Sequence, residues 1–381
     1  MTERVPVEVF PPGEYIREEL DERGWTQIDL AEILGRPLQL VNEIILDKRS
    51  ITPETAKGLA EAFGTSAQLW LNLQAAWELY RSRNIAPDPA ISLRARIYSV
   101  GPIKEMVKRG WIQHSSDPEV LEQRVLEFFG TTDLDEPPLP VAARMSTAYG
   151  AFSPSQWAWL CRARQLGKVV PVQGRFEPGE SARLLQRLRA LMRDPEEVRH
   201  VPRILGEAGI RFVVLEHLAK TRIDGACLWL DTKAPVIAIS LRYDRIDYFW
   251  FTVMHELKHA LHEDGLKNGV LTVDIDLVGA APVDRESRPD FEKEADEFAE
   301  NALIPKAELE DFVIRKQPLF SENAIRGFAA LHGIHAGIVV GQLHHRVGDY
   351  AKLRRLLVKV RDYITGSALT DGWGHTVPAI S

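Results

Sequence analysis

The second half of the chain contains a short pattern of residues that can hold a metal ion. Residues 255–259 read HELKH, an H-E-x-x-H motif that begins at His255 and ends at His259. Residues four apart on an α-helix lie about 40° apart around its axis, so a helix here places the two imidazoles side by side. Such a pair can share one Zn²⁺, and the adjacent Glu256 can take a proton from a metal-bound water.

The spacing of apolar residues predicts that this segment is helical. Phe251, Met254, Leu257 and Leu261 recur at helical intervals, and no proline or glycine interrupts the segment before Gly265. A surface helix that carries the motif by chance is the alternative interpretation, because a pattern this short arises by coincidence in about one chain in a hundred. A third ligand is therefore needed to support a metal site.

A hydrolytic zinc site needs a third protein ligand and an open position for water. The class that places a glycine and a third histidine after the motif is excluded, because His262 stands where that glycine would be. His262 is also a poor ligand itself, since on a straight helix it lies two turns from His255. The other class takes a glutamate from a second helix. Residues 291–303 predict such a helix, with an apolar stripe that runs from Phe291 to Leu303.

Two carboxylates share one face of this second predicted helix. Glu292 and Asp296 are four residues apart. We predict Glu292 as the third ligand and Asp296 as the carboxylate that fixes the tautomer of a ligating histidine. Glu294 is the alternative ligand, and a solvated acidic face without a metal is the alternative for the whole segment.

These two motifs resemble those of the ImmA/IrrE metallopeptidases. HELKHALH is followed by EKEADEFAENALIP, which matches the family pattern E-x-E-A-x-x-F-A-x-x-L-h-P with one extra residue between Ala299 and Leu303. The preceding segments IDGACLW, APVIAISL and FWFTVMHELKH also follow the family in order and spacing. The resemblance implies that His255, His259 and Glu292 are zinc ligands and that Glu256 is catalytic. It also implies a zincin-like (gluzincin) fold and a repressor-type protein, or the chain itself, as the substrate.

The whole-chain composition is that of a globular protein with more than one domain. The chain has 381 residues, of which 45% are hydrophobic and 27% charged, and its net charge is −7. This charge excludes a protein that binds polyanions over its whole surface. Two cysteines provide neither a disulfide framework nor a Cys-type zinc site. We found no apolar run of about 18 residues and no signal-peptide pattern, so we expect a cytoplasmic protein without membrane contact.

Residues 1–82 predict an all-helical domain with a helix-turn-helix. Helices are expected at 13–23, 27–34 and 37–46, and further ones begin after Thr52 and at Ser66. Ala31 is a small residue within the first helix of the motif, and Gly35 lies in the turn. In a DNA-binding domain of this kind, helix 37–46 enters the major groove.

Helix 37–46 and its flanks carry the candidate DNA contacts. We predict base contacts by Arg36, Gln39 and Asn42, and phosphate contacts by Lys48, Arg49 and Ser50. Residues 1–85 contain 9 Lys and Arg against 14 Asp and Glu, a balance of −5, whereas a DNA reader usually has a basic face. A helical bundle for dimerisation or protein binding is therefore the alternative.

The N-terminal domain resembles the helix-turn-helix domain (XRE-like) of HigA-type antitoxins. The resemblance rests on the PGE-x-h-x-E-x-L start, the T-Q-x-x-L-A turn, the ITPE-x-A-x-x-L-A segment and the LWLNLQ end. It implies binding to palindromic operator DNA as a homodimer, with a toxin as a further partner.

The remaining segments complete a multidomain organisation. Residues 83–206 predict a helical middle region, with helices at 103–108 and 119–129 and a linker at 133–140. Residues 207–318 predict the metallopeptidase core, an α+β domain with a small sheet, in which 210–215 is a strand and 226–230 and 236–240 form a hairpin. Residues 265–290 are expected to form a loop near the site. Residues 319–381 predict a helix–glycine turn–helix at 321–346, a basic helix at 352–361 and a frayed end from 367.

Three sets of polar side chains in these segments are candidates for a functional role. The arginine run at 183, 187, 189 and 193 is interpreted as a solvated face. The histidines at 332, 335, 344 and 345 lack ligand spacing and are not assigned to a second metal. Tyr248, His217 and His262 are the candidates for stabilising an oxyanion, and the sequence does not choose among them.

Together these features predict a DNA-binding transcriptional regulator with zinc-dependent endopeptidase activity, acting in a stress, phage or toxin–antitoxin circuit. The alternative is a HigA-like antitoxin or repressor whose peptidase-like domain is a non-catalytic sensor or partner-binding module. An intact H-E-x-x-H motif argues against this alternative, because a binding module has no need of Glu256. A third hypothesis is a protease that nucleic acid stimulates.

Overall fold

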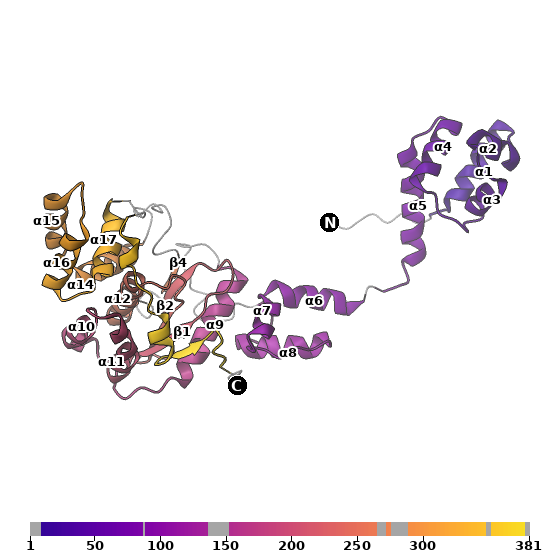
Figure 1. Cartoon of the computed structure of the whole chain (residues 1–381). Coiled ribbons are helices and arrows are strands. Elements are labelled where there is room, and N and C mark those ends of the chain that lie inside the picture. The colour runs from indigo at the N-terminus through magenta and orange to yellow at the C-terminus, as the bar shows by residue number, and fades with distance from the viewer. Residues whose placement is uncertain are drawn as a thin grey trace. The chain divides into compact units, whose positions relative to one another are not determined.

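The computed structural model describes residues 9–86, 88–135, 152–264, 272–275, 289–347 and 352–377. The chain divides into two compact units, residues 1–89 and residues 90–381 (Figure 1). Most of the two segments predicted as a linker (133–140) and a loop (265–290) lies outside the described residues.

The first unit is a bundle of helices, as predicted. Its helices are α1 (Pro12–Arg23), α2 (Gln27–Leu34), α3 (Leu38–Ile45), α4 (Pro53–Phe63) and α5 (Ala67–Ser82). Helix α2 has the bounds expected from the sequence, and α3 is one residue shorter at each end than the predicted 37–46.

Local capping explains where these helices begin and end. The Thr26 hydroxyl accepts the Asp29 N–H while the Asp29 carboxylate accepts the Thr26 N–H, which is a capping box at the start of α2. Gly35 ends α2 with a φ of 59°, a left-handed conformation that favours glycine. Gly13 has a different role: a Cβ there would lie 2.3 Å from the Ile45 carbonyl oxygen, so only glycine lets α1 approach the end of α3 this closely.

The second unit begins with helices that support a sheet. They are α6 (Pro89–Ser99), α7 (Ile103–Lys108), α8 (Pro118–Phe129), α9 (Pro154–Val169), α10 (Ser181–Arg189) and α11 (Val201–Glu207), with short 3-10 helices at Pro178–Glu180 and Pro195–His200. The predicted helices at 103–108 and 119–129 are confirmed, the second with one additional residue at its start.

The sheet of the second unit has five strands in the order β4-β2-β3-β1-β5. The strands are β1 (Arg211–Leu215), β2 (Ile223–Trp229), β3 (Pro235–Ile239), β4 (Thr272–Ile275) and β5 (Leu369–Asp371). β2 pairs antiparallel with β3 and β4, which confirms the predicted hairpin, and β1 pairs parallel with β3 and β5. The unit is therefore α+β with a small mixed sheet.

Alternate residues of the strands enter two different cores. Val213 and Ala238 belong to the same core as Trp159 and Leu166 of α9, whereas Val214 and Ile237 belong to the core that includes α12 (Ile246–His262). Strands β1, β2 and β3 are nearly continuously buried, so both of their faces are covered, since side chains alternate along a strand.

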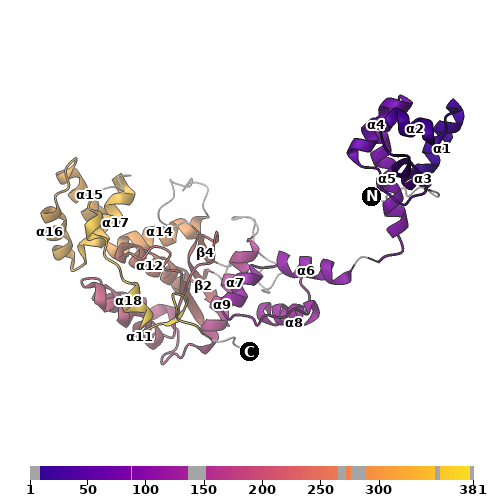
Figure 2. The same cartoon turned by 45° about the vertical axis from the view of Figure 1, so that its right-hand side comes forward.

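The remaining helices are α14 (Asp290–Leu303), α15 (Lys306–Lys316), α16 (Glu322–His332) and α17 (Ala336–Val347). Helices α15, α16 and α17 lie together on one side of the second unit in both views (Figure 2). The predicted helix–glycine turn–helix at 321–346 is confirmed, with Gly333 in the left-handed conformation between α16 and α17.

Two predictions for the C-terminus are wrong. The basic helix expected at 352–361 is replaced by a 3-10 helix at Arg354–Leu356 and by α18 (Arg361–Thr365). The Asp244 carboxylate accepts the N–H groups of Val360 and Arg361 and so starts α18 at this point. Within the end expected to fray from 367, Leu369–Asp371 instead form β5, and residues 378–381 lie outside the described residues.

A buried ion pair holds this terminal segment in place. Nε of Arg162 donates to Oδ2 of Asp371 at 2.7 Å, and the two side chains are 0% and 1% exposed. Trp111 donates to the same oxygen at 3.1 Å, and Arg162 also reaches the Val377 carbonyl at 2.6 Å. These long-range contacts outweigh the weak local propensity of the segment.

No helix among the described residues is by itself long and apolar enough to span a membrane. In this described part of the chain, one pair of helices, α16 and α17, has the necessary length and composition when taken together, and the pair is bent by 111°.

Candidate functional site

Helix α12 carries the H-E-x-x-H motif through the interior of the second unit. It begins at Ile246, five residues before the predicted segment, and packs against β2, β3, α14 and α17. His255, Glu256 and His259 are each 0% exposed. The prediction of a helix is confirmed, whereas the alternative of a surface helix is wrong.

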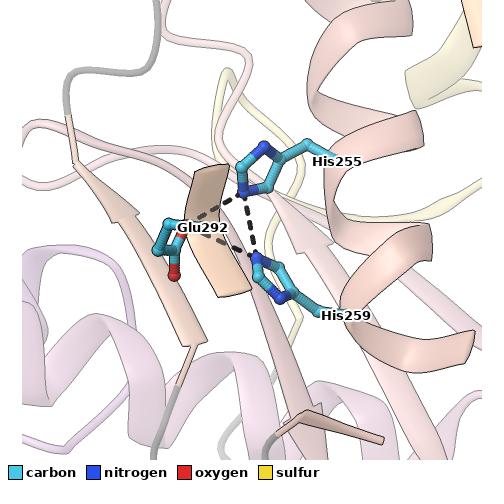
Figure 3. A group of neighbouring side chains, drawn as sticks. All are labelled: His255, His259 and Glu292. Atoms are coloured by element: carbon cyan, nitrogen blue, oxygen red, sulfur yellow. Dashed lines mark hydrogen bonds and ion pairs between the residues drawn. The ribbon is translucent and has the colours of Figure 1, made fainter. Parts of the chain in front are cut away.

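Helix α14 brings the third predicted ligand to the two histidines. Oε2 of Glu292 lies 3.2 Å from Nε2 of His255 and 3.5 Å from Nε2 of His259, and the two Nε2 atoms are 3.0 Å apart (Figure 3). This is the only group of three such side chains with converging ligand atoms among the residues that the structure describes. Glu294, the alternative ligand, is 60% exposed at its side chain and lies 3.6 Å from Lys258.

Each of the two imidazoles has a carboxylate at its other nitrogen. Nδ1 of His255 lies 3.1 Å from Oδ1 of Asp296, the partner predicted from the sequence. Nδ1 of His259 is hydrogen-bonded at 3.0 Å to Oδ2 of Asp264, which the sequence analysis missed. A histidine that donates its Nδ1–H to a carboxylate presents the lone pair of Nε2 to the opposite side. On the side away from these carboxylates, both Nε2 atoms lie within 3.5 Å of Oε2 of Glu292.

The residues present fit a divalent metal ion. Ligand atoms about 2.0–2.1 Å from a tetrahedral Zn²⁺ lie roughly 3.4 Å from one another. The three observed separations of 3.0, 3.2 and 3.5 Å are close to that spacing. Oε1 of Glu292 is buried and has no hydrogen-bond partner among the described residues. A cation bound between the three ligand atoms would balance the buried negative charge of Glu292.

The electrostatics of this cluster depend on burial and on its carboxylates. Burial acts to raise the pKa of Glu292, but the hydrogen bonds to His255 and His259 outweigh it and hold the pKa below its usual value. Burial acts to lower the pKa of His259, but the contacts with Asp264 and Glu292 raise it overall.

Glu256 projects from α12 towards the sheet. A Cβ built on Gly225 of β2 would lie 2.3 Å from Oε1 of Glu256 and 2.8 Å from Cγ2 of Thr252. The absence of a side chain at Gly225 therefore makes room for the carboxylate next to β2.

The ligand cluster contains none of the three candidates for an oxyanion-stabilising group. Tyr248 lies two turns before Glu256 on α12, and its hydroxyl interacts with Asp224 and Arg242. Burial raises the pKa of this hydroxyl. Nζ of Lys258 lies 2.6 Å from Nε2 of His262, and the His262 side chain is 51% exposed. His217 follows β1, where burial lowers its pKa.

The other singled-out groups have structural contacts. His332 lies 3.3 Å from Glu308, and His344 contacts the Lys352 carbonyl at 2.7 Å. In the arginine run, Arg187 pairs with Glu207, and Arg189 donates to the Ala302 carbonyl at the end of α14 at 2.6 Å. The run is thus only partly a solvated face, because Arg189 ties α10 to the helix that carries Glu292.

The six predicted DNA contacts are all exposed, and four of them have acidic partners within the first unit. Arg36 pairs with Glu54. Glu43 accepts from Gln39 at 2.9 Å and from Arg49 at 2.7 Å. Ser50 donates to Glu78 at 2.8 Å. Two of the three basic residues in the set, Arg36 and Arg49, thus pair with glutamates, and Asn42 and Lys48 complete the set.

Comparison with known proteins finds relatives of the first unit. A helix-turn-helix family model matches residues 16–70. Virulence-associated protein I of Dichelobacter nodosus is 44% identical over 69 residues, which are 18% of this chain and 64% of that protein, so the chain spans just under two thirds of this relative's length. The uncharacterized HTH-type transcriptional regulator YddM of Escherichia coli is 37% identical over 68 residues, which cover 18% of this chain and 72% of YddM. A solved HigA-family addiction module antidote protein from Coxiella burnetii is 35% identical, with a TM-score of 0.19. The match covers 22% of this chain and 100% of the chain of that protein. Through its N-terminal unit, the chain belongs to the helix-turn-helix family.

Proposed function

We propose that this chain is a DNA-binding regulator that also carries a zinc-dependent endopeptidase. For DNA binding, the support is membership of the helix-turn-helix family, a relative named as a transcriptional regulator, and the exposed Gln39 and Asn42 on α3. The expected target is palindromic operator DNA bound by a homodimer, since a dimer places two such helices on two half-sites.

The peptidase proposal rests on one observation, the convergence of His255, His259 and Glu292 in a buried cluster next to Glu256. The resemblance of the two motifs to the ImmA/IrrE metallopeptidases points to the same chemistry. A zincin-like fold is part of this proposal. A Zn²⁺ held by these three residues would lower the pKa of a water molecule and polarise the scissile carbonyl.

The protein residues divide the remaining work between them. Asp296 and Asp264 hold the two imidazoles with Nε2 towards Glu292. Glu256 takes a proton from the attacking water and passes it to the leaving amine. Gly225 leaves the space in which the Glu256 carboxylate lies. The proposed substrate is a repressor-type protein or the chain itself.

A second candidate function is an antidote-type regulator whose second unit senses or binds a partner, such as a toxin, without catalysis. The observation that favours it is the name of the HigA-family antidote protein, to which the first unit is 35% identical. The two functions make different use of Glu256, which only the peptidase needs as a base.

Metal content of the purified full-length protein tests the proposal. The wild type should bind about one zinc per chain, because the site offers three ligands for one ion. Glu292→Gln should lose the metal, whereas Glu294→Gln, a matched change in the same helix, should retain it. Glu256→Gln should keep the metal and lose cleavage of candidate repressors. A wild type that binds no zinc would refute the peptidase, and a zinc-loaded protein whose cleavage survives Glu256→Gln would refute the mechanism.

A further inference from the structure

The exposed face of α3 has an unusual composition for a DNA-reading helix. Leu38–Ile45 reads LQLVNEII and contains no lysine or arginine. Successive residues are about 100° apart around a helix axis, so Leu38, Gln39, Asn42 and Leu46 all lie within one arc of about 100°. All four are exposed, Leu38 at 42% and Leu46 at 50%.

The nearest arginines are already paired within the unit. Arg36 contacts Glu54, and Arg49 donates to Glu43 at 2.7 Å. Guanine is most often read by arginine or lysine, which donate to its O6 and N7 atoms. The reading face of α3 therefore lacks the side chains that recognise guanine.

The amides of this face suit adenine instead. Adenine presents N7 as an acceptor and N6–H₂ as a donor, and an asparagine or glutamine side chain can bind both. Glu43 can only accept hydrogen bonds, so the Gln39 amide must turn Nε2 towards it, at 2.9 Å. The second Nε2 hydrogen and Oε1 of Gln39 are then left for the donor–acceptor pattern of adenine. The Asn42 amide makes no hydrogen bond within the part of the chain that the structure describes.

The apolar residues of the same arc suit the partner base. The methyl group of thymine is the one apolar group on the major-groove edge, and aliphatic side chains make contact with it. Leu38 and Leu46 flank Asn42 at helical spacing, one turn before it and one turn after it.

From these observations we infer that α3 reads A·T base pairs, with Gln39 and Asn42 on adenines and Leu38 and Leu46 on thymine methyl groups. The inference rests on the proposed binding of duplex DNA by the first unit and specifies the base composition of its half-sites.

Selection of full-length protein on a random duplex library tests this inference. The selected half-sites should have A·T pairs at the positions contacted by α3. Asn42→Ala should weaken binding to the selected duplex by roughly 5- to 150-fold. Asn42→Arg should change the preference at one position from A·T to G·C. Asn72→Ala, which removes an exposed asparagine from α5, is the matched control and should leave affinity unchanged.

The outcomes separate the inference from the function on which it rests. If no duplex of any sequence is retained at low salt, the proposed DNA binding fails. If duplexes are retained but the selected half-sites carry guanine at the contacted positions, or if Asn42→Ala behaves like Asn72→Ala, DNA binding stands and the inference is overturned.

Discussion

Gly225 of β2 and Glu256 of α12 lie so close that no side chain fits between them. A Cβ on Gly225 would be 2.3 Å from Oε1 and 3.0 Å from Cδ of Glu256. The position of the proposed catalytic carboxylate thus depends on a residue that has no functional group. The strand and the helix are separate in the sequence, so this relationship exists only in the folded chain.

The substitution Gly225→Ala should move the Glu256 carboxylate without removing any ligand. We expect an unfolding free energy about 1–3 kcal/mol lower, from overpacking, and a kcat about 100-fold lower or more, because the proton acceptor is displaced. Bound zinc should remain near one per chain. The measurements are peptide cleavage, zinc content and denaturant unfolding of the same preparations.

Gly167→Ala is the matched control for this change. A Cβ there would meet Cγ2 of Val236 at 2.7 Å, on the α9 side of the same sheet. Gly167→Ala should lower the unfolding free energy by a similar amount and leave kcat unchanged. Equal losses of kcat in the two variants, or loss of zinc from Gly225→Ala, would contradict the proposed role of Gly225.

The two carboxylates behind the histidines should strengthen metal binding. Asp264→Asn and Asp296→Asn remove a negative charge beside Nδ1 of His259 and His255 respectively, so each should weaken zinc affinity by about 10- to 100-fold. Competition with a chelator of known affinity measures this directly. Asp290→Asn is the control, since its side chain is 94% exposed at the start of the same helix, and it should bind zinc like the wild type. Wild-type affinity in Asp264→Asn would show that the hydrogen bond has no effect on the site.

The ion pair between Arg162 and Asp371 should be essential for the stability of the second unit. Asp371→Ala leaves a guanidinium buried without its counter-charge and should lower the unfolding free energy by about 3–5 kcal/mol. Asp135→Ala, at an exposed pair with Arg96, should cost no more than about 1 kcal/mol. Tryptophan fluorescence during guanidinium unfolding compares the two, since Trp111 also contacts Asp371. Similar guanidinium midpoints for Asp371→Ala and Asp135→Ala would contradict a stabilising role of the buried ion pair.

His335 should make the stability of the second unit depend on pH. Burial lowers its pKa below the ordinary value, aided by Arg326 and opposed by Asp194. Its Nδ1 accepts the Gly337 N–H at the start of α17 at 3.0 Å, an interaction that protonation of Nδ1 abolishes. Because the unfolded state binds the proton more readily, the stabilisation is complete above the ordinary pKa and is lost as the pH falls through the folded-state pKa.

Unfolding free energies measured at intervals from about pH 7.5 to pH 5 test this expectation. The decrease at low pH should be smaller in His335→Gln than in the wild type. His375→Gln, which removes an exposed histidine, should follow the wild-type profile. An unchanged slope in His335→Gln would exclude this histidine as the source.

Features with a strong local pattern could be predicted from the sequence. The bounds of α2 follow from the capping box at Thr26 and from Gly35, and the hairpin of β2 and β3 follows from two apolar runs around a turn. That His255 and His259 share one face was also predictable, because helical periodicity fixes which side chains lie one turn apart. Glu292 was predicted from the acidic face of a second helix, and packing of α14 on α12 brings it to the histidines. An acidic residue shortly after the motif was the only sign of Asp264, and spacing alone does not say which way a chain turns after a helix ends.

Long-range contacts decided the rest. The basic residues after 352 have helical periodicity, yet the Asp244 carboxylate starts α18 only at Arg361. The end of the chain has little local propensity for a strand, yet Asp371 is drawn into the interior by Arg162 and pairs with β1. Residue type and helical spacing are local properties, and they indicate which residues can act. The surroundings of these residues, such as Gly225 beside Glu256 and Asp264 behind His259, depend on the tertiary structure, through packing between separate segments and the path of the chain after a helix ends.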